Sequence, residues 1–368
     1  EPPGRPIVSG CNSVLKPLAQ YVDFFIKPFV LSIPSFIKDS TNVINLIEGT
    51  AFNIESDLLV TMDIESLYTN IPQQEALNIL ISTLDKRPHP HRVPTGFIVE
   101  CAEIALKRNY FLFENQFYVQ TQGVAMGAVF APNIANLYVS DFENKFIFHS
   151  DNPYSINIIK WLRYIDDVFM VWRGTTCRLL EFHTWLNSLN LKLQFSIEYQ
   201  CKQIPFLDLM INTENGILIT NLYTKPTARN TLLKYSSHHA QSLKDNLPFG
   251  QFLRLRRNCF KKKPDYFSEA KKLMNKLKSR GYSSRLLRRS LKRAWYNDRE
   301  ALLKPKTKGS TNRLVCVTTF GTLSNKIKKV IKKHWRLLND DTLFAAQPMF
   351  AFKRGPNLRD KIVRAYNV

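Results

Sequence analysis

Two adjacent carboxylates, Asp166 and Asp167, stand between two apolar runs in residues 160–172, KWLRYIDDVFMVW. Runs rich in aromatic and β-branched residues predict the strands of a hairpin, with the acidic pair at or beside its turn. Asp is common in turns, so a plain turn is one interpretation. A hairpin turn without Gly or Asn is unfavourable, however, and rigidly paired carboxylates repel each other unless a cation binds them. The alternative interpretation is a site for hard divalent metal ions such as Mg²⁺.

A third carboxylate, Asp63, lies near the end of residues 57–64, DLLVTMDI. This apolar run predicts a buried strand, where a charge without a partner is costly. A lone Asp is also a common helix cap or turn residue. If both segments belong to one sheet, Asp63, Asp166 and Asp167 converge on two metals, the arrangement used for in-line nucleotidyl transfer.

Small residues mark a third segment, QGVAMGAVFAP, at 122–132. They allow a ligand or another backbone to approach closely. Close packing of a helix against a sheet is the alternative interpretation.

The remaining patterns predict an α+β fold. Helical periodicity and helix formers alternate with short β-prone runs, and Pro and Gly separate them. The expected helices are 13–50 (broken at Pro17, Pro28 and Pro34), 73–84, 97–107, 127–148 and 178–190; the expected strands are a hairpin over 109–123 that turns at Glu114-Asn115, and several within 191–224.

Taken together, the three acidic and small-residue segments resemble a reverse transcriptase. VTMDIESLYTNIP (60–72) is similar to motif A of that family, QGVAMGAVFAP to motif B, and the YIDD of RYIDDVFMVW to motif C. More narrowly, the chain resembles a Penelope-like retroelement reverse transcriptase. This narrower resemblance rests on AMGAVFAPNIANL (125–137), on IPFLDLMI with the segment 222–257 that follows it, and on MFAFKRGPNLRDKIVRAYNV at 349–368.

The resemblance implies specific roles. Asp63 and Asp166 match the metal-binding aspartates, and Asp167 matches the second aspartate of motif C. Tyr68 matches the aromatic residue under the sugar of the incoming nucleotide, where a bulky ring excludes a 2′-hydroxyl. The other implied nucleotide contacts are the Ile64 carbonyl, Gln122, Gly123 and Arg5, the last resembling the motif 2 arginine.

The resemblance also implies the architecture of a right-hand polymerase. We expect a palm, formed by an antiparallel sheet with packed helices, over 51–226 and a basic, mainly helical thumb over 227–368. Residues 1–50 would be a remnant of the fingers, most of which is missing. Segment 204–211 resembles the primer grip, and Lys192 and Lys202 are alternatives for the proton donor to pyrophosphate.

The charge distribution supports a polyanionic partner. The chain has a net charge of +22, and residues 251–368 carry 32 Lys and Arg against 7 Asp and Glu. Such a surplus favours nucleic acid over a solvated helix face or a nuclear-import signal, the two alternatives. A helix-turn-helix-like pair is expected over 228–260, turning at Pro248-Phe249-Gly250. The expected nucleic-acid-binding residues are Arg254, Arg256, Arg257, Lys261, Lys262, Arg285, Arg288, Arg289, Lys292 and Arg293.

The implied function is RNA-directed DNA polymerisation with an RNA template, a DNA primer and dNTPs. It would use two Mg²⁺ ions, with Mn²⁺ as an alternative. A hydrophobic share of 44% excludes a wholly disordered or fibrous chain. Six scattered cysteines and no apolar span suitable for a membrane predict an intracellular protein of the nucleus, made in the cytoplasm. The rival hypotheses are an inactive nucleic-acid-binding remnant, a fragment that does not fold alone, and an unrelated metal-dependent nuclease.

Overall fold

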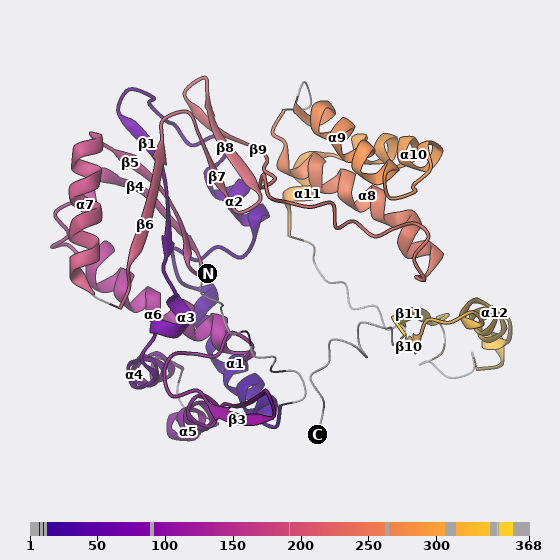
Figure 1. The fold of residues 1–368 in the computed structure, drawn as a ribbon, viewed down its shortest axis with the longest axis horizontal. Coiled ribbons are helices and arrows are strands. Elements are labelled where there is room, and N and C mark those ends of the chain that lie inside the picture. The colour runs from indigo at the N-terminus through magenta and orange to yellow at the C-terminus, as the bar shows by residue number, and fades with distance from the viewer. Residues whose placement is uncertain are drawn as a thin grey trace. The chain divides into compact units, whose positions relative to one another are not determined.

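The computed structural model describes residues 7, 10, 13–88, 92–190, 192–261, 265–305, 314–338, 344 and 346–355. The chain divides into two compact units, Glu1–Lys225 and Pro226–Val368. Figure 1 shows the helices and strands of both units.

The first unit contains a four-stranded antiparallel sheet with the strand order β4-β5-β1-β6. Its strands are β1 (Asp57–Ile64), β4 (Ile158–Tyr164), β5 (Asp167–Arg173) and β6 (Phe195–Gln200). The bounds of β1 agree with the apolar run 57–64. β5 is buried from Val168 to Trp172 because both of its faces are covered, which explains why its apolar residues do not alternate with polar ones.

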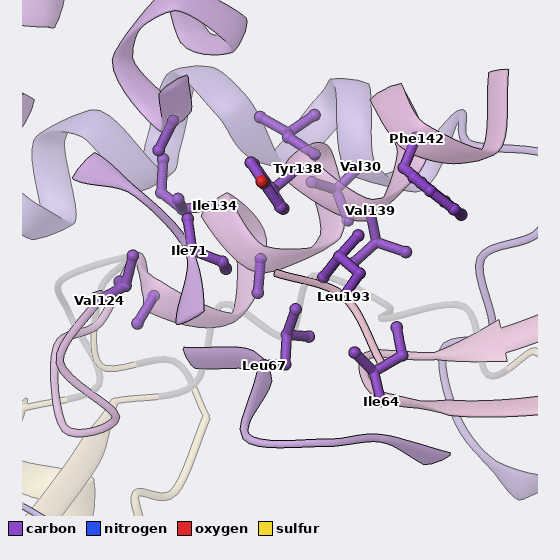
Figure 2. Packing of buried hydrophobic residues seen from close by; sticks show 14 of the residues in the cluster. Val30, Ile64, Leu67, Ile71, Val124, Ile134, Tyr138, Val139, Phe142 and Leu193 are labelled. Atoms are coloured by element: carbon purple, nitrogen blue, oxygen red, sulfur yellow. The ribbon is translucent and has the colours of Figure 1, made fainter. Parts of the chain in front are cut away.

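Helices cover one face of this sheet. Side chains alternate between the two faces of a strand, and Val60, Met62 and Ile64 of β1 join the main hydrophobic cluster with residues from several helices. Figure 2 shows Ile64 near Leu67, Val139 and other apolar side chains of this cluster. The helices of this unit are α1 (Lys16–Leu31), α2 (Ser40–Ile47), α3 (Leu67–Asn70), α4 (Gln73–Leu84), α5 (Thr95–Lys107), α6 (Ala131–Phe142) and α7 (Thr176–Leu189).

The opposite face of the sheet carries Asp63 and Phe169. The Phe169 ring packs against Phe206 with 5.6 Å between ring centroids. Phe206 ends β7 (Gln203–Phe206), which forms a second antiparallel sheet with β8 (Leu209–Glu214) and β9 (Ile217–Leu222). The main hydrophobic cluster therefore lies on the helix-covered face, and Asp63 projects from the other face.

A separate hairpin connects α5 to the small-residue segment. β2 (Tyr110–Phe113) pairs with β3 (Gln116–Val119) around Glu114 and Asn115, as the sequence predicts. Both turn residues have a positive φ, of 48° and 60°, which is the conformation of a type I′ turn.

The second unit begins with helices. They are α8 (Gln241–Asn258), α9 (Phe267–Lys278), α10 (Ser284–Trp295) and α11 (Arg299–Leu303). β10 (Val315–Thr319) and β11 (Met349–Lys353) pair in parallel, and α12 spans Ser324–His334. None of the helices in the described ranges is long and apolar enough to cross a membrane.

Two proline expectations are wrong. Pro28 lies inside α1, and Pro248 lies inside α8 rather than in a turn. A proline removes one helical hydrogen bond, and packing of the rest of the helix offsets that loss. The predicted helix-turn-helix turn at Pro248-Phe249-Gly250 is therefore corrected: α8 is continuous there, and a short connection, 279–283, joins α9 to α10.

Candidate active site

The acidic pair lies at a two-residue hairpin turn. Tyr164 pairs with Asp167 at the ends of β4 and β5, so Ile165 and Asp166 form the turn itself. Ile165 has a φ of 58°, a left-handed conformation that costs a β-branched residue roughly 1–2 kcal/mol. Strained residues of this kind concentrate at functional sites. The unfavourable turn noted in the sequence is thus a strained turn in the structure.

Strand pairing brings the third carboxylate to this turn. Asp63 of β1 is the cross-strand partner of Asp167 of β5. The Ile64 amide donates a hydrogen bond to the Asp166 carbonyl, with 3.1 Å between nitrogen and oxygen. Directly opposed residues of an antiparallel pair have Cβ atoms about 5 Å apart. Asp63, Asp166 and Asp167 therefore share one end of the sheet, where Asp63 is exposed and the other two are half-buried.

The electrostatics of this cluster favour a cation. Burial, followed by the neighbouring charges of Asp166 and Asp63, raises the pKa of Asp167 to about 6, and Lys225 opposes the shift. Carboxylate oxygens are the donors that hard divalent cations prefer, so the donor set fits Mg²⁺ or Mn²⁺. As the side chains are placed, no three His, Cys, Asp or Glu residues of the described chain form a ready-made metal site. The argument that these residues suit a divalent cation therefore rests on their carboxylate oxygens and on the repulsion between their negative charges.

The small-residue segment packs against α3. Gly123 has a φ of 74°, and a Cβ at this position would lie 2.7 Å from the Tyr68 carbonyl oxygen and 2.8 Å from the Thr69 backbone. The Val124 amide donates to the same Tyr68 oxygen over 2.7 Å, and Gln73 Nε2 donates to the Gly123 oxygen over 3.0 Å. Only glycine combines this conformation with this close approach.

Tyr68 links the small-residue segment to the carboxylates. It is half-buried on α3, and burial raises its pKa to about 12, with further contributions from the charge of Asp166 and from Tyr164. Tyr68 is thus within electrostatic reach of Asp166. Gln122, two residues before Val124, is exposed.

Two cavities meet at Thr121 and Gln122. One has a volume of about 640 Å³, and another of about 300 Å³ extends towards the β2–β3 hairpin. The larger is lined by Asn70, Pro72, Gln73, Gln74, Lys107, Thr121, Gln122 and Lys192. The smaller is lined by Thr69, Phe111, Val119, Gln120, Thr121, Gln122, Val124, Ala125 and Met126.

The structure separates the two candidate lysines. Ser196 of β6 pairs with Asp63, and Lys192 lies four residues before it, at the carboxylate end of the sheet. Lys202 follows the opposite end of β6, beyond the Gln200–Leu59 pair. Lys192 also forms an ion pair with Glu75, which holds its ammonium group in place. Of the two lysines, Lys192 is therefore the one at the carboxylate end of the sheet.

The basic residues of the second unit are divided between surface and core. On α10, Leu287, Ser290 and Ala294 are buried, whereas its basic residues are exposed. These exposed residues are Arg285, Arg288, Arg289, Lys292 and Arg293. The Arg293 guanidinium lies 3.8 Å from the ring centroid of Phe249, a cation–π contact.

One of the expected surface residues requires correction. Arg256 is only 4% exposed, because α8 turns it into its unit, so we remove it from the expected nucleic-acid-binding residues. Arg254 is exposed, and Arg257 and Lys261 are partly exposed. Arg5 and Lys262, also named from the sequence, lie outside the described residues.

Sequence reasoning missed two buried side chains near the turn, Arg163 and Glu143. Both are fully buried and form an ion pair of 2.8 Å. Arg163 immediately precedes Tyr-Ile-Asp-Asp, and a charged residue inside an apolar strand was a signal that could have identified it.

Comparison with known proteins gives two family matches. The family described as reverse transcriptase (RNA-dependent DNA polymerase) matches residues 4–200, and the animal helix-turn-helix domain matches residues 231–292. The second range contains α8, α9 and most of α10. No curated protein sequence matches the chain.

Solved telomerase structures are similar to the chain. The telomerase of Candida albicans in complex with a TWJ fragment of telomeric RNA has 12% identity and a TM-score of 0.54, covering 88% of this chain and 57% of that one. Apo telomerase of Candida tropicalis has 13% identity and a TM-score of 0.46, covering 66% of this chain and 44% of that one. The chain thus spans about half the length of these structures, and the first likeness indicates a shared fold.

Proposed function

Because the chain belongs to the reverse transcriptase (RNA-dependent DNA polymerase) family, we propose that it copies RNA into DNA at the end of β1 and the β4–β5 turn. The observation that carries this proposal is the cross-strand pairing of Asp63 with Asp167, beside Asp166 in the strained turn. The family match does not depend on these contacts, and it covers all three carboxylates.

Asp63, Asp166 and Asp167 would hold two Mg²⁺ ions, or Mn²⁺. When bound, such ions lower the pKa of a primer 3′-hydroxyl and neutralise the charge of a triphosphate. The three carboxylates would hold these ions in position. The protein itself contributes little covalent chemistry. Lys192, which forms an ion pair with Glu75, would give a proton from Nζ to the leaving pyrophosphate.

The substrate contacts follow from the residues around the carboxylates. Tyr68 restricts the space for a 2′-hydroxyl, which selects dNTPs, and Gln122 borders the two cavities where nucleotide and template would lie. By the resemblance to the family, Arg5 would contact the triphosphate and the Ile64 carbonyl would bind a metal ion.

The finer assignment is a Penelope-like element enzyme with palm and thumb regions. It is supported by the motif B form AMGAVFAPNIANL and by the segments that follow IPFLDLMI. In this assignment residues 51–226 act as the palm. The exposed cations of α10 act as a thumb surface that contacts the phosphates of a template–primer duplex.

Primer extension tests the proposal. The full chain is incubated with an RNA template, an annealed DNA primer, dNTPs and Mg²⁺ or Mn²⁺, beside Asp166→Asn. Asp151→Asn, which changes an exposed carboxylate in a loop, is the matched control. We expect extension by the wild type and the control, and a loss of about 10³-fold in Asp166→Asn with duplex binding retained.

Other outcomes point to the rival functions. Extension that is unchanged in Asp166→Asn would contradict the active-site assignment. Salt-sensitive duplex binding without any extension would indicate a non-catalytic nucleic-acid-binding protein, and metal-dependent shortening of the substrate would indicate a nuclease.

A further inference from the structure

A buried polar network lies directly behind the acidic turn. Arg163 of β4 and Glu143, the first residue of a π-helical turn (Glu143–Ile147) after α6, have no exposed side-chain surface. Arg163 Nε and Nη2 donate to the two Glu143 carboxylate oxygens over 2.8 and 3.0 Å. This two-point pairing fixes the plane of the guanidinium as well as its distance.

The network leaves little freedom to the arginine. Nη1 donates to Asn136 Oδ1 over 2.8 Å, and Nη2 also reaches the Asn136 carbonyl over 3.3 Å. Glu143 accepts two further hydrogen bonds, from Ser35 Oγ and Trp161 Nε1. The backbone of Arg163 is fixed as well, because its amide donates to Ser35 O and its carbonyl accepts from the Ile37 amide.

The fifth donor of the guanidinium points at the turn. Arg163 Nη1 donates to the carbonyl oxygen of Ile165 over 3.1 Å. Ile165 is the strained, left-handed residue immediately before Asp166. The turn therefore receives a charge-assisted hydrogen bond at the peptide group that joins Ile165 to Asp166, and such bonds are stronger than neutral ones.

We propose that Arg163 is a positioning residue for the reaction: through the Ile165 carbonyl it holds the turn in the conformation that places Asp166 beside Asp63. Buried ion pairs add little net stability over apolar replacements, so a fully paired network at this place favours a role in geometry. The proposal rests on the proposed function, because it assumes that these carboxylates perform the chemistry.

The same sheet supplies a matched control. At its other end Asp57 pairs with Arg173 over 2.8 Å, six positions from the Asp63–Asp167 pair, which is about 20 Å along the strands. Arg173→Lys should disturb the far end of the sheet without reaching the turn. Two amides report on the two ends: Ile64, bonded to Asp166 O, and Gly174, bonded to Ser56 O over 2.9 Å.

The experiment compares Arg163→Lys with Arg173→Lys in the full chain. Hydrogen exchange of the two amides is measured without metal, and the kcat, the KM for dNTP and the duplex Kd of primer extension are measured with Mg²⁺. In Arg163→Lys we expect the exchange rate of the Ile64 amide to rise. We expect kcat to fall by about 10- to 100-fold, which corresponds to the loss of one hydrogen bond to a charged group. The KM and the duplex Kd should change little in this variant. In Arg173→Lys the exchange of the Gly174 amide should rise instead, with Ile64 exchange unchanged.

A second variant separates positioning from stability. Arg163→Met combined with Glu143→Leu removes both buried charges together, a replacement that is often neutral or stabilising. We expect this double variant to fold, with fast Ile64 exchange and low kcat. A folded double variant with wild-type Ile64 protection and kcat would overturn the proposal.

Failure of the proposed function gives a different pattern. A wild-type chain that does not extend primers would contradict the polymerase proposal, while the exchange of Ile64 would still test whether Arg163 holds the turn.

Discussion

Gly123 lies against the backbone of Tyr68 so closely that a single added carbon would overlap it, at 2.7 Å from the Tyr68 carbonyl oxygen. This contact joins the small-residue segment to the helix that follows β1. Through Tyr68, which interacts electrostatically with Asp166, it brings Gln122 close to the helix that follows the Asp63 strand. The packing of the small-residue segment against α3 therefore requires a glycine at this position.

Gly123→Ala should destabilise the protein. The added Cβ meets backbone atoms of Tyr68 and Thr69, and alanine disfavours the φ of 74°. We expect a loss of about 2–4 kcal/mol in the free energy of unfolding, measured by urea denaturation. Gly96→Ala, in α5 with nothing within 4 Å of the new Cβ, is the control and should be neutral or stabilising. Equal stability of the two variants would contradict this packing argument.

Tyr68→Ala should relax sugar discrimination. Removal of the half-buried ring opens space beside Asp166 for a 2′-hydroxyl. We expect the preference for dNTPs over ribonucleotides, as the ratio of kcat/KM values, to fall by about 10- to 200-fold. Tyr110→Ala removes an exposed ring from β2 and should leave the ratio unchanged. A ratio that does not move in Tyr68→Ala would show that this ring does not shape the sugar pocket.

Divalent metal should stabilise the folded chain. Asp63, Asp166 and Asp167 carry neighbouring negative charges, and an ion that binds only the folded form raises its stability by mass action. We expect the Tm to rise with the Mg²⁺ concentration. At a concentration 100 times the Kd of the ion, the free energy of unfolding should increase by about 2.7 kcal/mol. Added KCl of equal ionic strength serves as the control, and Asp63→Asn and Asp166→Asn should reduce the Mg²⁺ effect. An equal rise in Tm in both variants would place the ion elsewhere.

The Asp57–Arg173 pair should make stability depend on acid pH. Burial alone would raise the pKa of Asp57, but hydrogen bonds from Arg173, the Asn53 amide and Ser56 hold it below the ordinary 3.8. A depressed folded-state pKa stabilises above the unfolded value, and that stability is lost as the pH falls through the folded value. Asp57→Asn should therefore cost about 1–3 kcal/mol at pH 7 and progressively less below pH 4, measured by urea denaturation. A constant difference from pH 7 to pH 3 would contradict the assignment.

Charges on α10 should control duplex binding. Arg288→Gln with Arg289→Gln removes two exposed cations, and each lost phosphate contact lowers the slope of log K against log salt by about 0.9. The affinity of the chain for an RNA–DNA duplex should fall for all sequences alike. Lys27→Gln with Lys86→Gln, exposed lysines of the first unit, should leave the slope unchanged. An unaltered slope in the α10 variant would exclude this helix from the interface.

Local patterns were sufficient for much of the fold. The apolar run 57–64 matches β1, and the aromatic runs around Glu114 match the β2–β3 hairpin. These predictions succeed because alternation, apolar content and turn residues act over a few neighbouring residues. The predicted breaks at prolines were wrong in α1 and α8, because the packing of a whole helix outweighs the loss of one hydrogen bond.

The residues with the chemistry for a metal-dependent transfer can be identified from their types and spacing: three carboxylates, an aromatic residue five positions after the first, and a basic C-terminal third. Their positions relative to one another depend on strand pairing and packing. Asp63 faces Asp167 because β1 pairs with β5 in one register, and a one-residue slip would turn Asp63 to the helix-covered face. Likewise, Arg256 is buried and Arg163 meets Glu143 because burial and ion pairing depend on packing between segments, which no local pattern contains.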